Sequence, residues 1–199
     1  MRQSTLERLH ILTKTRNGYV GTPALLNAGF TNRQIAELVE KDILEKIAHG
    51  QYWMNCLEYD KPKEYKAVEV GMVNPGAVIC ADSACYYQGL IQMEPKALSI
   101  ATRRCDRHKM NMNFEVTRHY YSEKNFEENC VIKTTTQGDY KVYNIDRSVC
   151  DCIRFRDDIE QEIFNLIIEN YKKDTESQIE RLKAYAKKMR VEKKVEKYL

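Results

Sequence analysis

The sequence lacks any long apolar run. Its 199 residues contain no stretch approaching the ~18 consecutive apolar residues that a membrane helix needs. Residues 1–15 also lack the charged start and apolar centre of a secretory signal, and have an amphipathic helical pattern instead. We therefore expect a cytoplasmic protein that has no membrane partner.

The sequence also lacks the short motifs of common enzymes. It has no glycine-rich phosphate loop, no HExxH, no GxSxG and no CxxC. Two half-sites, Cys105-x-x-His108 and Cys150-x-Cys152 with His119, do not have the closely paired ligands of structural zinc. On a helix, the two cysteines of the second half-site point about 200° apart. We expect no catalytic residue, no metal and no cofactor, and thiols that are reduced and mostly buried.

The composition is that of a folded globular protein. Apolar residues make up 43% of the chain and charged residues 31%, which excludes a disordered protein. The stretch 57–63, with its Asp-Lys-Pro-Lys ending, has the character of a linker. The sequence therefore predicts two domains, residues 1–57 and residues 62–199. The excess positive charge lies in residues 181–199, where it indicates either a solvated helix face or a non-specific DNA contact.

Residues 1–57 have the element order of a winged helix-turn-helix. Three short helical patterns come first, and the tight link at Gly29 suits the turn of a helix-turn-helix. Two strand-like segments, 44–48 and 51–54, then flank the two-residue turn His49-Gly50. This order predicts a DNA-binding domain.

The third helical segment has the strongest local pattern. Thr31 and Gln34 are spaced as a capping box, and Phe30 and Ile35 as a hydrophobic staple. In this motif the start of the helix meets the base edges, where Arg suits guanine and Asn or Gln suits adenine. The candidate DNA-binding residues are Thr31, Asn32, Arg33 and Gln34 on this helix, Lys14 and Arg16 beside it, and Lys46, His49 and Gln51 on the hairpin.

Other features favour a different use of this surface. Thr31 and Gln34 already serve as a cap, which limits their freedom to read bases. Glu37 and Glu40 lie on the same exposed face and would repel phosphates. Winged helices also serve as protein-binding modules. A basic run at 103–109 is interpreted as a solvated loop in preference to a second phosphate contact.

Residues 62–199 alternate between helical and strand-like patterns. Helices are expected at 63–73 and 82–90, then strands at 97–102, 113–121, 130–135 and 139–145, then helices at 147–155, 158–172 and 176–199. Asp146 is placed as the cap of the first of these last helices. The fold class is therefore α+β: an N-terminal winged helix-turn-helix followed by a mixed α+β C-terminal domain that ends in helices.

The run from Gly18 to Trp53 resembles the N-terminal domain of AbiEi-type antitoxins, from type IV (abortive-infection) toxin–antitoxin systems. The shared positions are Tyr19-Val20, Thr22, Ala28-Gly29, Arg33-Gln34 and Gly50-Gln51-Tyr52. Residues 78–90 resemble the family's short helix ending in Gly-Leu. Residues 143–156 resemble its strand, Asp-Arg-Ser step and apolar helix. The likeness spans most of the chain, although this wing is poorer in Arg than those of its relatives.

The resemblance implies two activities and no enzyme. The winged helix would bind inverted repeats in its own promoter as an autorepressor, which implies a dimer on DNA. The C-terminal domain would counter a nucleotidyltransferase-type toxin encoded beside it, with direct contact left open. Asp151, in the segment most like the family, and Arg147, one helical turn before it, are the candidates for antitoxin function.

Two other classes of function remain open from the sequence. One is a stand-alone transcriptional regulator whose C-terminal domain senses a ligand or dimerises, which an apolar pocket in that domain would support. The other is a protein-interaction module whose winged helix binds no DNA.

Overall fold

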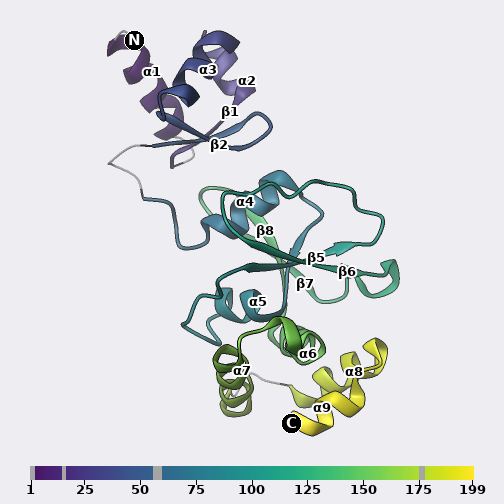
Figure 1. Ribbon diagram of the computed structural model, residues 1–199. Helices are drawn as coiled ribbons and strands as arrows, with labels where there is room; N and C mark the ends of the chain where they lie inside the picture. The colour runs from purple at the N-terminus through teal and green to yellow at the C-terminus, as the bar shows by residue number, and fades with distance from the viewer. Residues whose placement is uncertain (1–2, 15–16, 56–59, 175–177) are drawn as a thin grey trace. The chain divides into compact units, whose positions relative to one another are not determined.

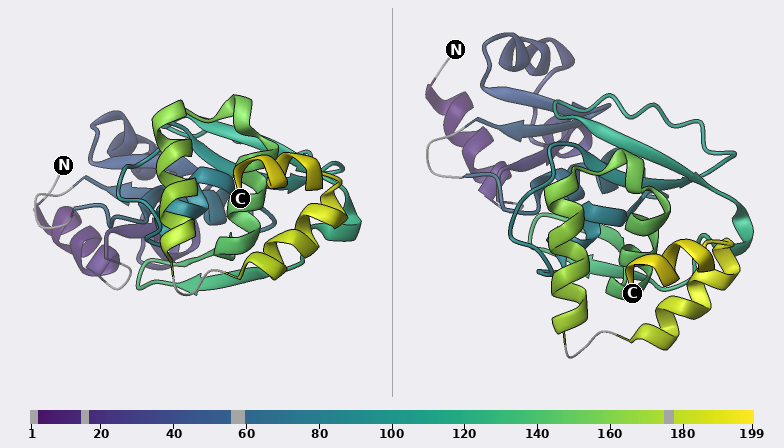
Figure 2. Two further views of the ribbon diagram at one scale, coloured as in Figure 1. Left: turned by 90° about the horizontal axis from the view of Figure 1, so that it is seen from below. Right: turned by 60° about the horizontal axis from the view of Figure 1, so that its bottom comes forward.

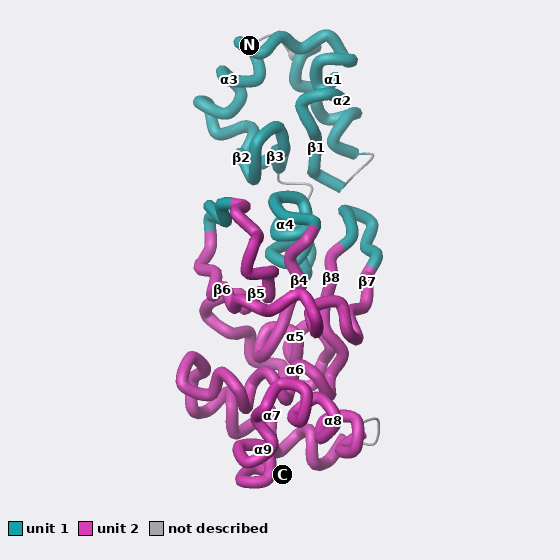
Figure 3. Tube along the Cα trace, turned by 90° about the vertical axis from the view of Figure 1, so that its right-hand side faces the viewer, with its two compact units in different colours: residues 1–75, 109–113, 134–139 teal, residues 76–108, 114–133, 140–199 magenta. Residues whose placement is uncertain are grey.

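The computed structural model contains two compact units (Figures 1 and 3). It describes residues 3–14, 17–55, 60–174 and 178–199. Unit 1 consists of the described residues up to Pro75, together with 109–113 and 134–139. Unit 2 consists of 76–108, 114–133 and the described residues from Tyr140 onward. Because contacts define these units, unit 1 includes two segments that are distant in sequence from the winged helix.

Unit 1 has the winged helix-turn-helix order predicted from the sequence. Its elements are α1 (Gln3–Lys14), β1 (Tyr19–Gly21), α2 (Thr22–Asn27), α3 (Asn32–Glu40), β2 (Leu44–Ala48) and β3 (Gln51–Met54). The strands form an antiparallel sheet in the order β1-β3-β2, and the β2–β3 hairpin is the wing. One buried cluster joins helices and sheet: Leu9, Val20, Leu25, Phe30, Ile35, Leu38, Leu44 and Met54.

Helix α3 begins with the predicted capping box. The Thr31 hydroxyl accepts a hydrogen bond from the Gln34 backbone N–H at 3.2 Å, and the Gln34 side-chain oxygen accepts one from the Thr31 backbone N–H at 2.9 Å. Phe30 and Ile35 are both buried in the same cluster, as a hydrophobic staple requires. Local sequence therefore fixes where this helix starts and which face it buries.

The second face of the small sheet is also covered. Tyr19, Ile47 and Trp53 form a buried cluster with Met72 of α4 (Tyr65–Val73), because neighbouring strand residues point to opposite faces. The Tyr19 hydroxyl donates to Glu69 Oε1 at 3.0 Å. Lys61 Nζ lies 2.9 Å from that same oxygen and 2.8 Å from Glu45 Oε2. Burial raises the pKa of Glu69, an effect that Lys61 opposes.

Two glycines of unit 1 have positive φ for different reasons. Gly18 (φ +104°) lies against the Trp53 ring, and a Cβ at this position would be 2.4 Å from the nearest ring carbon. Gly29 (φ +82°) forms the α2–α3 turn, and a Cβ there would meet only the end of the Arg8 side chain, at 3.5 Å. Both need the backbone freedom of glycine, but only Gly18 also needs the empty space.

Unit 2 is built on a mixed five-stranded sheet. Its strands are β4 (Val78–Ile79), β5 (Leu98–Arg103), β6 (Val116–Tyr121), β7 (Cys130–Thr134) and β8 (Asp139–Tyr143), in the order β6-β5-β4-β8-β7. Strand β4 pairs antiparallel with β5 and parallel with β8, and β5 pairs parallel with β6. Short 3-10 turns occupy Glu123–Asn125 and Arg156–Asp158.

The helices of unit 2 gather on one side of this sheet (Figure 2). They are α5 (Ala81–Tyr87), α6 (Ile145–Arg154), α7 (Gln161–Lys173), α8 (Ile179–Met189) and α9 (Glu192–Tyr198). Helix α6 packs against each of the other four. Its residues from Asp146 to Ile153 are all buried, so α6 is the central helix of the core.

The α+β fold class is confirmed, but three details of the sequence-based assignment are wrong. Asn144, not Asp146, caps α6, since its side chain accepts from the Arg147 backbone N–H at 3.0 Å. The last helix is two helices, because Arg190 adopts a left-handed conformation (φ 59°) that ends α8. The short strands β1 and β4 were not predicted, since segments of two or three residues carry no periodicity. No helix among the described residues is long and apolar enough to cross a membrane.

Replacing Gly18 with Ala should destabilise unit 1 more than replacing Gly29 with Ala. Both variants place an alanine at positive φ, which costs about 1–2 kcal/mol. Only Gly18→Ala also forces a methyl group into the Trp53 ring, and such overpacking costs about 1–3 kcal/mol more. Trp53, the single tryptophan of the chain, gives a fluorescence signal for urea unfolding, with far-UV circular dichroism as a second probe. Equal losses of stability would contradict the close contact between Gly18 and Trp53.

Candidate nucleic-acid interface

The start of α3 presents a polar surface to solvent. Thr31, Asn32 and Arg33 are exposed and Gln34 is half-buried. These four residues follow the short turn at Gly29, where the backbone has positive φ. The structure therefore brings the predicted base-reading residues together on the first turn of one helix.

The capping box divides these residues into two groups. The Gln34 side-chain oxygen accepts hydrogen bonds from both the backbone N–H and the hydroxyl of Thr31, at 2.9 and 3.2 Å. Reading adenine with two bonds requires both the oxygen and the nitrogen of an amide, so Gln34 is committed to the helix start. Among the described residues, neither Asn32 nor Arg33 makes a side-chain hydrogen bond or ion pair. Asn32 and Arg33 are therefore the side chains available to meet bases.

The acidic residues of α3 differ in how far they oppose an anion. Glu37 Oε1 lies 2.6 Å from Lys41 Nζ, and this hydrogen bond lowers the pKa of Glu37. The pair contributes no net charge to the helix face. Glu40 is exposed and has no such partner among the described residues. The repulsion expected from two carboxylates is thus reduced to that of Glu40, one exposed charge at the far end of α3 from Arg33.

The wing and α1 supply the remaining predicted contacts. Lys46 and His49 are exposed on the wing, and Gln51 is half-buried. The wing turn is tied to the start of α2, because the Thr22 backbone N–H donates to the Gly50 carbonyl at 2.8 Å. Gln51 lines a small cavity of about 230 Å³ beside β1 and α2. Lys14 is exposed at the end of α1, and Arg16 lies outside the described residues.

A groove beside the wing contains residues that the sequence did not single out. It has a volume of about 490 Å³ and is lined by Lys46, Ile47, Ala48, His49, Met72, Val73, Lys109 and Asn111. Lys109 closes the basic run at 103–109, which the sequence placed in a solvated loop. Within that run, Arg103 instead pairs with Glu123 at 2.8 Å and with Glu127. The cluster of basic residues at 103–109 was the sequence feature that could have indicated an anion-binding surface. Their spacing does not show that the chain returns to the wing after residue 109.

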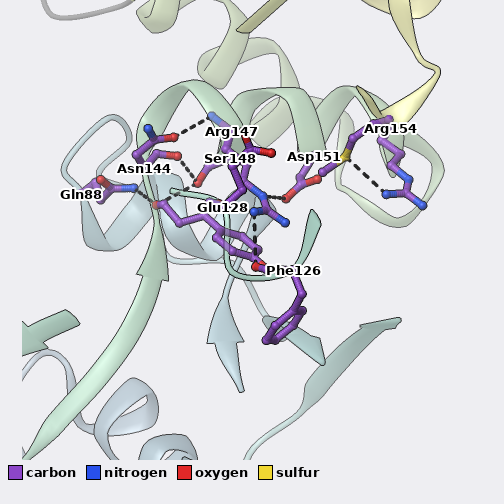
Figure 4. A network of polar contacts seen from close by, with 10 residues as sticks. Gln88, Phe126, Glu128, Asn144, Arg147, Ser148, Asp151 and Arg154 are labelled. Carbon is purple, nitrogen blue, oxygen red and sulfur yellow. Dashed lines mark hydrogen bonds and ion pairs between the residues drawn. The ribbon is translucent and has the colours of Figure 1, made fainter. Parts of the chain in front are cut away.

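Arg147 and Asp151, the candidates for antitoxin function, lie inside unit 2 (Figure 4). Both side chains are 0% exposed, and Arg147 Nε lies 3.9 Å from Asp151 Oδ2. The Arg147 guanidinium stacks 3.4 Å from the centre of the Tyr143 ring. Its Nη1 donates to the Phe126 carbonyl at 3.3 Å and also to the Glu128 carbonyl. Arg147 thus anchors the turn before β7 to α6.

Asp151 has an unusual environment for a carboxylate. Burial raises its pKa to about 6, although the nearby Arg147 guanidinium opposes the shift. By geometry, neither carboxylate oxygen has a hydrogen-bond partner among the described residues, nor do Nε and Nη2 of Arg147, but the Tyr121 hydroxyl is close enough to lower the pKa of Asp151. Both side chains are closed off from solvent, and the printed contacts of Arg147 join α6 to the turn around Phe126.

The cysteine and histidine half-sites are separated in the structure. Cys105 and His108 are exposed, whereas Cys150 and Cys152 are buried in α6. His119 stacks on Phe155 with ring centres 3.9 Å apart, and burial lowers its pKa. Burial also raises the pKa of Cys150 to about 12, which disfavours the thiolate that a metal requires. Within the described residues, no three His, Cys, Asp or Glu side chains gather to form a metal site.

Replacing Asp151 with Asn should remove a pH-dependent part of the stability of unit 2. Because the folded-state pKa of about 6 exceeds the value near 4 of an unfolded aspartate, the folded state binds the proton more tightly. The contribution of Asp151 to the free energy of unfolding is fully present below pH ~4 and is lost as the pH rises through about 6. The stability difference between wild type and variant should fall by a few kcal/mol over that window. Urea unfolding followed by circular dichroism measures it.

The matched control for that experiment is Asp157→Asn, at an exposed carboxyl. A plot of its unfolding free energy against pH should run parallel to that of the wild type. Trp53 fluorescence reports unit 1, so the two units can be followed separately in the same samples. Parallel curves for wild type and Asp151→Asn would show that Asp151 is not the buried acid that the geometry describes.

Comparison with known proteins shows the fold and no family. No family model and no curated protein sequence match the chain. The crystal structure of the RV2827C protein from Mycobacterium tuberculosis has the same fold, with a TM-score of 0.68. The match covers 92% of this chain and 72% of that one, at 12% sequence identity. The arrangement of elements described above is thus found in a solved structure, whose side chains are largely different.

Proposed function

We propose that this chain is a transcriptional repressor that binds DNA through α3 and the wing of unit 1. The observation that carries this proposal is the start of α3, where Asn32 and Arg33 are exposed and make no side-chain hydrogen bond or ion pair with another described residue, while the cap holds the helix in place. An asparagine and an arginine at this point of a helix-turn-helix suit adenine and guanine edges in the major groove. The operator is then a duplex site in the chain's own promoter, as in the AbiEi-type antitoxins that the sequence resembles.

We further propose that the chain is the antitoxin of a type IV toxin–antitoxin pair. The support is the likeness of residues 18–53, 78–90 and 143–156 to AbiEi-type antitoxins. The partner is then a nucleotidyltransferase-type toxin encoded by the adjacent gene, and the protein is not an enzyme. Since Arg147 and Asp151 are buried, antitoxin action falls to surface residues that α6 and its neighbours position.

One observation favours a second candidate, a stand-alone regulator with a ligand site in unit 2. A groove of about 300 Å³ lies along α8 and α9 and is lined by Ile179, Lys183, Ala186, Glu192, Val195, Glu196 and Leu199. Its volume is at the lower end of the range for small-molecule sites. Its apolar floor and charged rim suit a small amphipathic ligand. This candidate shares the DNA-binding step, so it differs from the first only in what unit 2 does.

Arg33 variants test DNA binding at α3. In gel shifts on the DNA upstream of the gene, Arg33→Ala should lose the specific complex. Arg33→Lys keeps the charge but not the two-bond fork, so it should retain non-specific binding and lose most specificity, by about 1–3 kcal/mol. Two salt concentrations separate the effects, because only phosphate contacts give a strong salt dependence. If both variants form the specific complex as well as the wild type does, α3 is not the helix that reads the bases.

Glu40→Gln tests the same surface in the opposite direction. Removing the uncompensated carboxylate should strengthen DNA binding, because α3 then meets phosphates without repulsion. The matched control is Glu162→Gln, which removes one exposed carboxylate from α7 in unit 2. A gain from Glu40→Gln together with no effect of Glu162→Gln supports the assignment. Weaker binding by the Glu40 variant contradicts it.

Growth rescue tests the antitoxin proposal separately. The adjacent gene is induced in a host that expresses this chain from an unrelated promoter. Wild type and Arg33→Ala should both restore growth, because the antitoxin step is assigned to residues outside α3. If neither restores growth while the wild type still shifts its promoter, the protein is a regulator without antitoxin activity, and the α8–α9 groove becomes the next site to probe.

A further inference from the structure

The groove beside the wing is a second cationic surface in unit 1. Four of its lining side chains can donate hydrogen bonds: Lys46 and His49 on the wing, and Lys109 and Asn111 on the 109–113 segment (teal in Figure 3). All four are exposed, and none makes a side-chain hydrogen bond or ion pair with another described residue. Among the described residues, no carboxylate lines the groove. Its floor includes the apolar residues Met72 and Val73 at the end of α4.

The 109–113 segment is attached to the wing by a specific contact. The Asn113 side-chain nitrogen donates to Glu45 Oε1 on β2 at 2.7 Å. The other oxygen of Glu45 pairs at 2.8 Å with Lys61, which it shares with Glu69, so the charge of Glu45 is partly compensated on the side of the sheet that faces α4. Glu45 therefore holds the segment in place while Lys61 reduces its negative charge.

The chemistry of this groove suits phosphodiester oxygens. Lysines bind phosphate as point charges, and neutral donors such as an asparagine amide fix its position. A groove of about 490 Å³ is larger than one phosphate group, which fits consecutive phosphates of a strand better than a single small anion. Lys46 and His49 belong to both the groove and the wing, so the groove continues the surface assigned above to DNA.

We propose that the groove between the wing and residues 109–113 binds the DNA backbone next to the base-reading site, with Lys109 as its principal phosphate contact. The inference rests on the proposed DNA-binding function and adds a contact from a segment that lies about 60 residues beyond the wing in the sequence. Lys109 contributes affinity without sequence preference, because phosphate contacts position a protein and base contacts specify.

Lys109→Ala and Asn113→Ala test this directly in the full-length protein. Binding is measured by fluorescence anisotropy over a salt series, on the promoter duplex and on a scrambled duplex of equal length. Lys109→Ala should weaken both complexes by the same factor and reduce the salt slope by about one. Asn113→Ala keeps Lys109 but removes the contact that holds residues 109–113 against Glu45. It should therefore weaken binding to both duplexes by a smaller factor. Lys133→Ala is the charge-matched control and should change neither.

A shortened duplex tests the position of the contact. Trimming the base pairs that flank the α3 site should remove the difference between wild type and Lys109→Ala, since the flanking phosphates are then absent. If Lys109→Ala and Lys133→Ala bind alike on the long duplex while Arg33→Ala loses specificity, the groove is not used and the proposed function stands. If the wild type binds no duplex at low salt, the proposed function fails, and this inference fails with it.

Discussion

Unit 1 depends on a buried carboxylate. Glu69 is 1% exposed, and such a charge would be costly without partners. It has two, because the Tyr19 hydroxyl donates to it from β1 and Lys61 pairs with it from the chain before α4. Lys61 also pairs with Glu45 on β2, so its ammonium joins α4 to β2, while the Tyr19 hydroxyl joins α4 to β1. The three-stranded sheet is consequently covered on both faces, and the wing is supported along the strand that bears Lys46. The groove beside the wing is therefore lined by residues on a supported strand.

Unit 2 also contains a buried charge, but there the charge is positive. Arg147 is fully buried, and its charge is balanced by the Tyr143 ring, two backbone carbonyls and the carboxyl of Asp151. These partners come from β8, from the turn before β7 and from α6 itself, so the guanidinium joins three parts of the core. Residues 143–156, one of the three runs in which the sequence analysis found a resemblance to AbiEi-type antitoxins, thus include the structural centre of the unit. In α6 that resemblance falls on buried residues, so it concerns the core and not a surface that could meet a partner.

The sequence predicts best where interactions are local. The Thr31–Gln34 cap and the Phe30–Ile35 staple act over three to five residues, and both form as expected. It predicts less well where two nearby residues compete. Asn144 and Asp146 are both suitable caps, but Asp146 instead joins α7 to the start of α8. It accepts hydrogen bonds from the Tyr171 hydroxyl of α7 and the Gln178 backbone, and it pairs with Arg181 of α8. It predicts least where partners are far apart, since Asn113 and Glu45 lie 68 residues apart and no spacing links them.

In the proposed DNA complex, α3 has few side chains that could read bases. With Thr31 and Gln34 held in the cap, two residues of α3 remain for bases, and each well-placed pair contributes about 1–3 kcal/mol of discrimination. Discrimination of that size does not by itself give a stable complex, because sequence-independent affinity comes mainly from phosphate contacts. The wing supplies only Lys46 and His49, and α3 carries an exposed Glu40. A protein with this α3 therefore needs cations from elsewhere in the chain. Lys109 lies in the same groove as the two wing cations, and in the proposed complex it supplies the backbone affinity that the short recognition surface lacks.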